Sequence, residues 1–464
     1  MSAPVLWIIT PLLIALFFLL LGRIPRVSMV LGALISSLVA ISVLLMQVQF
    51  DYMIGSTIFQ IESTFTVLGR AFILDNGDRT FVFLFYAISA VYLWFGVFYD
   101  DEPTYAPMSL AIPALLSAAM AVQIRLFSVL FVMLSVLLCL PLMVKKDGES
   151  EHGEQFLLIF TALSIPLLLL AGWSADMVTV NPLDTAMMER AILFTTVGFT
   201  LLLGLFPFML WMPMVGQQTR PTRALYVLLL LPIAFSLLLF HTSTRGVWFR
   251  EAVVLQDWLT IQGYCMIALG GLWAVFEDDL RRFFAFGLVI DSGFALIAMR
   301  QAYLGEPTLL FQVLTIRVVI FILFTLAVNV LDAHSIPLTI KGLRGRLSQV
   351  PVTMLALFGV LFSFNGIPLL AAFSSRIYIV DVMMTSEGAG GWVWILVGLV
   401  GYFLGTLRFL GSMVDIRSEQ KWVFNENWPE ILFLSTGVLL LVLLGLFPAF
   451  TGDLIQTLWA GFVS

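Results

Sequence analysis

The sequence predicts an all-α integral membrane protein that crosses the bilayer about fourteen times. Two observations carry this prediction. Hydrophobic residues make up 61% of the 464-residue chain and charged residues only 11%, whereas soluble domains carry about 25% charged residues. Apolar runs of spanning length also recur along the whole chain, without a Pro- or Ser-rich linker between them. We therefore expect one polytopic membrane domain over residues 1–464, with the lipid bilayer as its surroundings.

The individual spans are predicted from apolar runs of about 20 residues. They fall at residues 4–22, 27–48, 79–99, 106–123, 125–144, 155–173, 189–211, 224–241, 259–276, 283–299, 308–331, 351–373, 390–412 and 430–450. The first run has no basic segment before it and no small-residue cleavage site after it. We therefore expect it to be a span and not a removed signal peptide.

The stretch from Phe50 to Asp78 interrupts the apolar pattern between the second and third spans. Residues 56–62 alternate polar and apolar side chains, which is typical of a strand. Asn76-Gly77-Asp78 is a turn signal. We predict a short β-hairpin outside the membrane in this stretch.

The distribution of Lys and Arg predicts the orientation of the chain. Loops after odd-numbered spans hold more of these residues than loops after even-numbered spans. Cytoplasmic loops of membrane proteins carry such an excess. We therefore expect a multi-pass protein of a prokaryotic cytoplasmic membrane, with both termini on the outer side.

Several function classes receive no support from the sequence. The net charge is −6 and no basic tail exists, so a nucleic-acid partner is not expected. The three His are scattered, and Cys139 and Cys265 have no CxxC partner, so no metal site is predicted. No phosphate loop and no catalytic triad is found. We therefore expect neither a bound cofactor nor a catalytic residue in this chain.

Two predicted spans contain a proline close to a glycine. Pro207 follows Gly204, and Pro368 follows Gly366. Proline removes a backbone donor and clashes with the preceding turn, and in a membrane the freed carbonyls need a partner or a wet cavity. A simple kink explains either proline alone. Two broken helices five spans apart indicate two structural repeats, an arrangement found in many ion transporters.

Asp291, Arg317 and Arg376 are charged residues that lie inside or at the edge of predicted spans in the second half of the chain. A charge in the membrane interior costs several kcal/mol unless it is paired or hydrated. We expect an Asp291–Arg317 or an Asp291–Arg376 ion pair inside the bundle. The three residues are candidates for an ion path, but a pair that only locks helices together is an equal alternative, because arginine keeps its proton at neutral pH.

Three motifs resemble the antiporter-like membrane subunits of respiratory complex I, particularly subunit N of NADH-quinone oxidoreductase. Pro207-Phe208-Met209-Leu210-Trp211-Met212-Pro213 is similar to the family's Pro-Phe-His-x-Trp-x-Pro on the seventh helix. Residues 279–286, Asp-Leu-Arg-Arg-Phe-Phe-Ala-Phe, are similar to its Asp-Leu-Lys-Arg-x-x-Ala-Tyr. Residues 366–376 are similar to the Gly-x-Pro-x-x-x-x-Phe-x-x-Lys of its broken twelfth helix. The resemblance extends from about residue 60 to 450, and the family includes Mrp-type antiporters and subunits of membrane-bound hydrogenases.

The resemblance implies a fold of fourteen helices built on two inverted five-helix repeats, at about residues 106–241 and 259–412, each with a broken helix. It implies a place in the membrane arm of a redox-driven, proton-translocating assembly, with other membrane-arm subunits as partners. In an NADH-quinone oxidoreductase-like or hydrogenase-like complex, the chain would be a non-catalytic subunit. Members of the family are thought to move protons through buried lysines, one of them paired with a glutamate on the fifth helix.

The first half of this sequence departs from the family pattern. Leu202 occupies the position of the seventh-helix lysine, Met209 that of the histidine, and Ser135 or Val136 that of the fifth-helix glutamate. None of these side chains can carry a proton through a membrane. The first half has therefore lost the titratable groups that the resemblance implies.

The second half keeps charges at the matching positions. Arg376 occupies the position of the twelfth-helix lysine, and Arg317 lies where several relatives have a lysine. We therefore expect a subunit whose role is largely structural or coupling, with any proton path confined to the second half. The alternative is an independent cation/proton antiporter, or a partner subunit of an ion channel.

Overall fold

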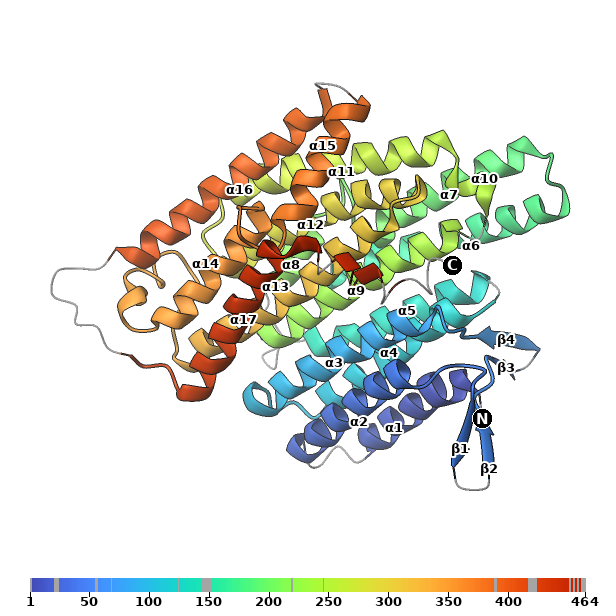
Figure 1. Cartoon of the computed structure of the whole chain (residues 1–464), viewed down its shortest axis with the longest axis horizontal. Coiled ribbons are helices and arrows are strands. Elements are labelled where there is room, and N and C mark those ends of the chain that lie inside the picture. The colour runs from blue at the N-terminus through green and yellow to red at the C-terminus, as the bar shows by residue number, and fades with distance from the viewer. Residues whose placement is uncertain are drawn as a thin grey trace. The chain divides into compact units, whose positions relative to one another are not determined.

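The predicted all-α membrane class is confirmed by a computed structural model of the chain. The structure describes residues 2–20, 25–54, 57–67, 69–123, 125–143, 152–217, 220–244, 246–387, 390–415, 424–449, 452–453, 455–456 and 459. Within these residues, nine helices are long and apolar enough to cross a membrane, and shorter apolar helices accompany them. Every predicted span overlaps at least one helix (Figure 1).

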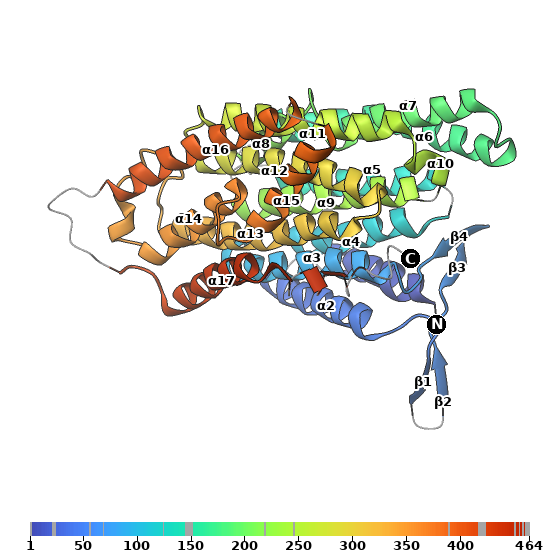
Figure 2. The same cartoon turned by 45° about the horizontal axis from the view of Figure 1, so that its top comes forward.

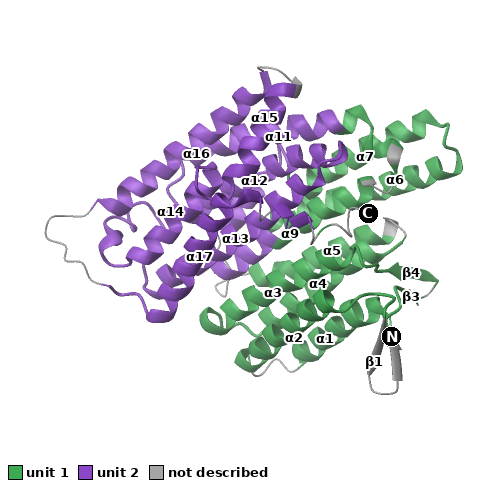
Figure 3. Cartoon of the chain, viewed as in Figure 1, with its two compact units in different colours: residues 1–204, 230–255, 457–464 green, residues 205–229, 256–456 purple. Residues whose placement is uncertain are grey.

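The chain folds into two compact units, which Figure 3 distinguishes by colour. Unit 1 comprises residues 1–204, 230–255 and 457–464. Its helices are the π-helix η1 (Val5–Ile9), α1 (Thr10–Leu20), α2 (Pro25–Leu45), α3 (Arg79–Tyr99), α4 (Tyr105–Ala121), α5 (Arg125–Met143), α6 (His152–Val180), α7 (Thr185–Leu202), most of α9 (Pro221–Thr244) and α10 (Val247–Arg250).

Unit 2 comprises residues 205–229 and 256–456. It contains α8 (Trp211–Gly216), the first turns of α9, most of α11 (Val253–Ala274), α12 (Leu280–Tyr303), α13 (Pro307–Ala333), the 3₁₀ helix η2 (Arg346–Ser348), α14 (Pro351–Asn365), α15 (Phe373–Glu387), α16 (Gly391–Val414) and α17 (Trp428–Leu446). The boundaries of the two inverted repeats stay a prediction.

The predicted hairpin region forms two hairpins. Strands β1 (Asp51–Ile54) and β2 (Thr57–Gln60) pair antiparallel, as do β3 (Thr64–Val67) and β4 (Arg70–Ile73). Both hairpins lie at the same end of unit 1 as the N-terminus (Figure 1 and Figure 2). The predicted turn at Asn76 also has a partner, because its side chain accepts from Val48 N at 2.8 Å and donates to Val48 O at 3.0 Å. Ser56, at the start of the predicted strand, lies outside the described residues.

Helix α12 forms the core of unit 2. Nearly all of its residues are buried, and its flanking aromatic residues pack tightly. The ring of Phe284 stacks on Phe324 with 3.6 Å between centroids, and Phe283 stacks on Tyr402 at 4.5 Å. A helix that is buried on all sides normally carries only apolar residues. Asp291, in the middle of α12, is therefore an exception that needs charged partners.

Helices α11 and α16 approach each other through glycines. A Cβ atom on Gly271 would overlap the backbone of Gly398. Small residues allow such close packing between membrane helices, where apolar burial gives little net gain. This contact holds α16 beside the core of unit 2.

Candidate functional site

The second predicted broken helix is interrupted at the expected glycine and proline. Helix α14 ends at Asn365, and Gly366 adopts a left-handed conformation with φ of 68°. Pro368 lies in the break, and α15 begins at Phe373. Gly366 N donates to Ser363 O at 3.0 Å, which closes the last turn of α14. A non-glycine residue is strained at this φ, so the glycine in the motif determines where the helix stops.

The first predicted broken helix is interrupted in the same way. Helix α7 ends at Leu202, and α8 begins at Trp211. Gly204 has a φ of 59° and Pro207 lies within the break. The Gly–Pro spacing therefore predicted both interruptions correctly, although it did not predict how short α8 is.

The break in the second half leads directly to a buried charge cluster, which we define as Asp291, Arg317 and Arg376. Arg317 Nε donates to Asp291 Oδ2 at 2.6 Å, and Arg376 Nη2 donates to Asp291 Oδ1 at 3.3 Å. The exposed fractions of the Arg317, Arg376 and Asp291 side chains are 0%, 4% and 5%. Both alternatives that the sequence left open are therefore present at once, because one carboxylate accepts from two guanidinium groups.

Three separate helices supply the cluster. Asp291 lies on α12, Arg317 on α13, and Arg376 in the first turn of α15. The N-terminal turn of a helix favours negative charge, so Arg376 needs a nearby carboxylate. Arg376 also packs over Gly366, where a Cβ atom would lie 2.7 Å from Arg376 Cδ. The cluster thus ties the second piece of the broken helix to α12 and α13.

The ring of Phe294 contacts the cluster, and this residue was not predicted from the sequence. Arg376 Cζ lies 4.6 Å from the centroid of the Phe294 ring, a cation–π contact. Phe294 is three residues after Asp291 on α12. Residues at this spacing share a helix face, so the spacing was a signal that could have identified Phe294.

Polar contacts also hold the two pieces of the broken helix from outside the cluster. Asn365 Nδ2 donates to Thr406 Oγ1 on α16 at 3.0 Å. Gln312 Nε2 on α13 donates to Ser374 Oγ on α15 at 3.1 Å. Both ends of the break are therefore fixed by hydrogen bonds that join helices distant in the sequence.

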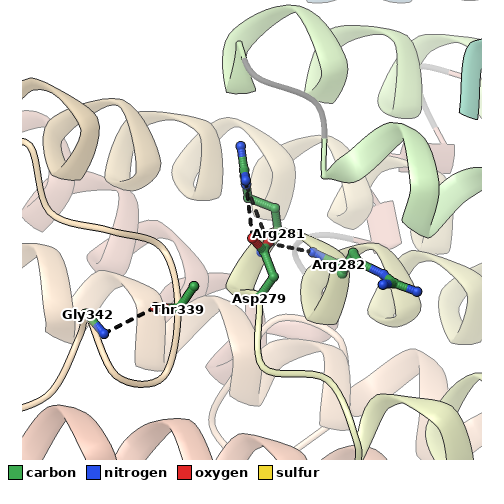
Figure 4. A network of polar contacts seen from close by, with 5 residues as sticks. All are labelled: Asp279, Arg281, Arg282, Thr339 and Gly342. Atoms are coloured by element: carbon green, nitrogen blue, oxygen red, sulfur yellow. Dashed lines mark hydrogen bonds and ion pairs between the residues drawn. The ribbon is translucent and has the colours of Figure 1, made fainter. Parts of the chain in front are cut away.

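The motif at residues 279–286 forms the N-terminal cap of α12 and not part of the cluster (Figure 4). Asp279 Oδ1 accepts from Arg281 N at 2.8 Å and from Arg282 N at 3.3 Å, and its Oδ2 pairs with Arg281 Nη2 at 3.1 Å. Nearby, Thr339 Oγ1 accepts from Gly342 N at 3.2 Å. The capping carboxylate stabilises the start of the helix that carries Asp291.

Glu277, just before this cap, lies outside the spanning helices. It pairs with Arg282 at 3.2 Å. Burial raises the pKa of Glu277 above its ordinary value, against the opposing effect of Arg282, and the negative charges of Asp279 and Asp278 raise it further. The turn before α12 therefore holds several charges close together, and the ionised form of Glu277 is disfavoured there.

The matching positions in the first half are buried and apolar. Leu202 is 2% exposed, Val136 0% and Met209 1%. Ser135 is buried as well, and its hydroxyl donates to Val132 O of its own helix at 2.7 Å. None of these four side chains offers a group that titrates near neutral pH.

Unit 1 nevertheless contains a small cavity whose mostly apolar lining includes a few polar side chains. Its volume is about 50 Å³, and its lining includes Ser128, Thr195 and His241. A cavity of this size can hold water where polar partners are available. His241 thus lines this cavity, at some distance along the chain from the positions that match the family motifs.

Comparisons with known proteins agree with this architecture. A family model described as the transmembrane region of NADH:quinone oxidoreductase/Mrp antiporters matches residues 126–405. NADH-quinone oxidoreductase subunit N of Ectopseudomonas mendocina is 24% identical over 317 residues, which cover 65% of this chain and 61% of that protein. The chain spans 55% to 61% of the length of the first three curated relatives that it matches.

Solved structures share the fold. A chain of respiratory complex I from Thermus thermophilus matches with a TM-score of 0.73 and 18% identity, over 96% of this chain and 98% of that one. A chain of the Mrp complex from Dietzia sp. matches with a TM-score of 0.77 and 15% identity, over 100% and 98%. The family model covers more than half of the sequence. The chain is therefore a multi-pass, antiporter-like membrane subunit that belongs to the NADH:quinone oxidoreductase/Mrp antiporter family.

Proposed function

We propose that this chain is a membrane-arm subunit of a complex I-type, redox-driven, proton-translocating assembly in a prokaryotic cytoplasmic membrane. Its partners are other membrane-arm subunits, and both termini face the outer side. Within that assembly its role is structural or coupling. Family membership supports the general class, and the contrast between its two halves supports the specific role.

The first half, in this proposal, conducts no protons by the route of its relatives. A proton path through hydrocarbon needs ionisable groups that can both bind and release a proton. Leu202, Val136 and Met209 are buried and have no such group. The broken helix α7–α8 is retained without the chemistry that the family resemblance assigns to it.

The single observation that carries the proposed role is the geometry of the Asp291–Arg317–Arg376 cluster. Both guanidinium groups keep their protons at neutral pH. They are therefore poorly suited to release and rebind a proton in a relay. Their contacts with one carboxylate, at 2.6 and 3.3 Å, join α12, α13 and α15. The cluster acts as a lock that holds the broken helix α14–α15 in place.

The proposal is tested with Asp291→Ala and Arg376→Ala in the intact assembly, by measuring assembly and proton pumping separately. If the cluster is a lock, both variants reduce the amount of assembled complex, while the complexes that do assemble pump a normal number of protons per electron. If assembly survives and pumping per electron is abolished, the cluster is part of the ion path and the structural role is wrong.

Purification separates this proposal from an independent cation/proton antiporter or a channel partner. A redox subunit co-purifies with hydrophilic and iron–sulfur subunits. Cation/proton exchange by the isolated chain in liposomes, without co-purifying redox subunits, would contradict the proposal.

A further inference from the structure

The charges of the buried cluster do not balance. Arg317 and Arg376 each carry one positive charge, since guanidinium is not deprotonated in proteins. Asp291 supplies one negative charge, and in the described part of the chain no other carboxylate contacts either arginine. One carboxylate and two guanidinium groups therefore leave the cluster with one excess positive charge.

The cluster also has fewer hydrogen-bond acceptors than buried donors. Each oxygen of Asp291 already accepts one guanidinium hydrogen bond. Arg317 Nη1, Arg317 Nη2 and Arg376 Nη1 are buried and have no hydrogen-bond partner among the described residues. Both Nη atoms of Arg317 therefore present donors from one planar group.

The ring of Phe294 offsets only part of the charge. It covers Arg376 at 4.6 Å, and a cation–π contact compensates a charge less than an ion pair does. Arg317 is fully buried, and its two Nη atoms have no hydrogen-bond partner in the part of the chain that the structure describes. An unpaired buried charge is costly, and water can complete hydrogen bonds but cannot neutralise the charge.

We propose that the Nη donors of Arg317, together with Arg376, bind one small monovalent inorganic anion of the halide class. The fork of guanidinium donors suits an anion. The small size follows from the burial of all three side chains, which are at most 5% exposed. The inference deepens the proposed lock, because the anion would neutralise the cluster that holds α12, α13 and α15 together.

Chloride is the probe for this site. The full chain, purified in detergent with any co-purifying subunits, is titrated with chloride against gluconate at constant ionic strength. Radioactive chloride is expected to bind at one saturable site per chain, and the thermal midpoint Tm is expected to rise with occupancy, because a ligand that binds the folded state stabilises it.

Substitutions at Arg317 assign the site. Arg317→Met removes the excess charge and the Nη donors, so chloride affinity is expected to fall about tenfold or more. Arg317→Lys keeps the charge and is expected to retain part of the binding. The matched control is Arg344→Met, at an exposed arginine that pairs with Asp415 outside the cluster; it is expected to bind chloride like the unchanged chain.

Two binding results count against the inference. Absence of saturable binding to a folded unchanged chain overturns it, and so does a chloride affinity in Arg317→Met equal to that of the unchanged chain. Because the readout is binding, the anion site can fail while the proposed membrane-arm role stands. Loss of redox partners on purification would instead count against the proposed role alone.

Discussion

Both halves of this chain contain a broken helix, but the residues at the two breaks differ in charge. In the first half, α7 stops beside Leu202, which is 2% exposed and apolar. In the second half, α15 starts beside Arg376, which is paired with Asp291. Glycine and proline thus suffice to interrupt a helix, whereas charged partners are a separate feature. The interruption in the first half is therefore present without an ionisable side chain at Leu202, Val136 or Met209.

Removal of the shared carboxylate is expected to have the largest effect. Asp291→Ala leaves two buried guanidinium groups without an ion pair. Loss of one partner of a buried salt bridge destabilises a protein by about 3–5 kcal/mol. The thermal stability of the full chain and its amount in the membrane are expected to fall strongly.

The control for Asp291→Ala is Asp415→Ala. Asp415 pairs with Arg344 at 2.6 Å, but the two side chains are 46% and 60% exposed. Exposed pairs contribute about 0–1 kcal/mol. Equal stability of Asp291→Ala and Asp415→Ala would show that the buried cluster does not hold the helices together.

A charge placed in the apolar half is expected to have the next largest effect. Leu202→Lys buries an ammonium group at an apolar position that is 2% exposed. The cost of a charge at the centre of a membrane helix is about 3 kcal/mol on insertion scales. A lower Tm and a lower yield are expected.

Leu202→Met is the volume-matched control, and hydrophobic exchanges of this kind cost less than about 1.5 kcal/mol. If Leu202→Lys is as stable as Leu202→Met, the interior around Leu202 is hydrated, and the contrast between the two halves is weaker than the sequence indicates.

A substitution of Gly366, the glycine at the second break, tests how far that break depends on glycine. Gly366→Ala places a Cβ in a left-handed backbone conformation with φ of 68°, 2.7 Å from Arg376 Cδ. Backbone strain alone costs about 1–2 kcal/mol. We expect a lower Tm and a displaced Arg376. The control is Gly411→Ala, on α16, where the Cβ position has open space around it. This variant is expected to be neutral or slightly stabilising. A lower Tm for Gly411→Ala than for Gly366→Ala would contradict this account.

Helix α14, before the break, has a cap that comes from a distant part of the chain. The Glu426 carboxylate accepts from Val352 N at 3.2 Å, Thr353 N at 2.6 Å and Thr353 Oγ1 at 2.7 Å. Glu426→Ala is expected to lower stability by about 1 kcal/mol. Glu306→Ala is the matched control, because Glu306 precedes α13 without a side-chain capping bond. If denaturation shows that Glu426→Ala and Glu306→Ala lower the free energy of unfolding by similar amounts, Glu426 does not stabilise α14 as a cap.

The smallest expected effect concerns pH. Burial raises the pKa of Glu277 above its ordinary value of 4.5. A carboxyl group with a raised pKa binds its proton more tightly in the folded chain, so its contribution to stability is lost as pH rises through the raised pKa. Glu277→Gln is therefore expected to raise Tm at neutral pH, and this difference is expected to vanish below about pH 4.5.

Asp332→Asn, at an exposed position, is the control for Glu277→Gln and is expected to change Tm little at either pH. A difference between Glu277→Gln and the unchanged chain that grows on acidification would have the wrong sign for a carboxyl group of raised pKa.

Hydropathy and local motifs predicted much of this architecture because both act over short stretches of chain. Each predicted apolar run overlaps a helix, and the Gly–Pro pairs located both breaks. The region before α3 was predicted as one hairpin but forms two, because the second pairs residues 64–67 with 70–73, beyond the alternating segment that was recognised.

The site was predicted less completely because its geometry depends on how helices pack. The sequence identified Asp291, Arg317 and Arg376 but left two pairings open, and both exist. The cap of α14 by Glu426 joins residues 73 and 74 positions apart. No local pattern encodes such a contact, and only the packed structure brings its partners together.

The most direct test of the central claim removes every charge of the cluster at once. The triple substitution of Asp291→Asn, Arg317→Gln and Arg376→Gln keeps polar groups of similar shape and leaves no charge unpaired. Neutral replacement of a complete buried ion network is often tolerated. We expect this variant to assemble and to pump as many protons per electron as the unchanged complex. A variant that assembles fully but no longer pumps would show that the cluster carries protons, and would contradict the account of a lock.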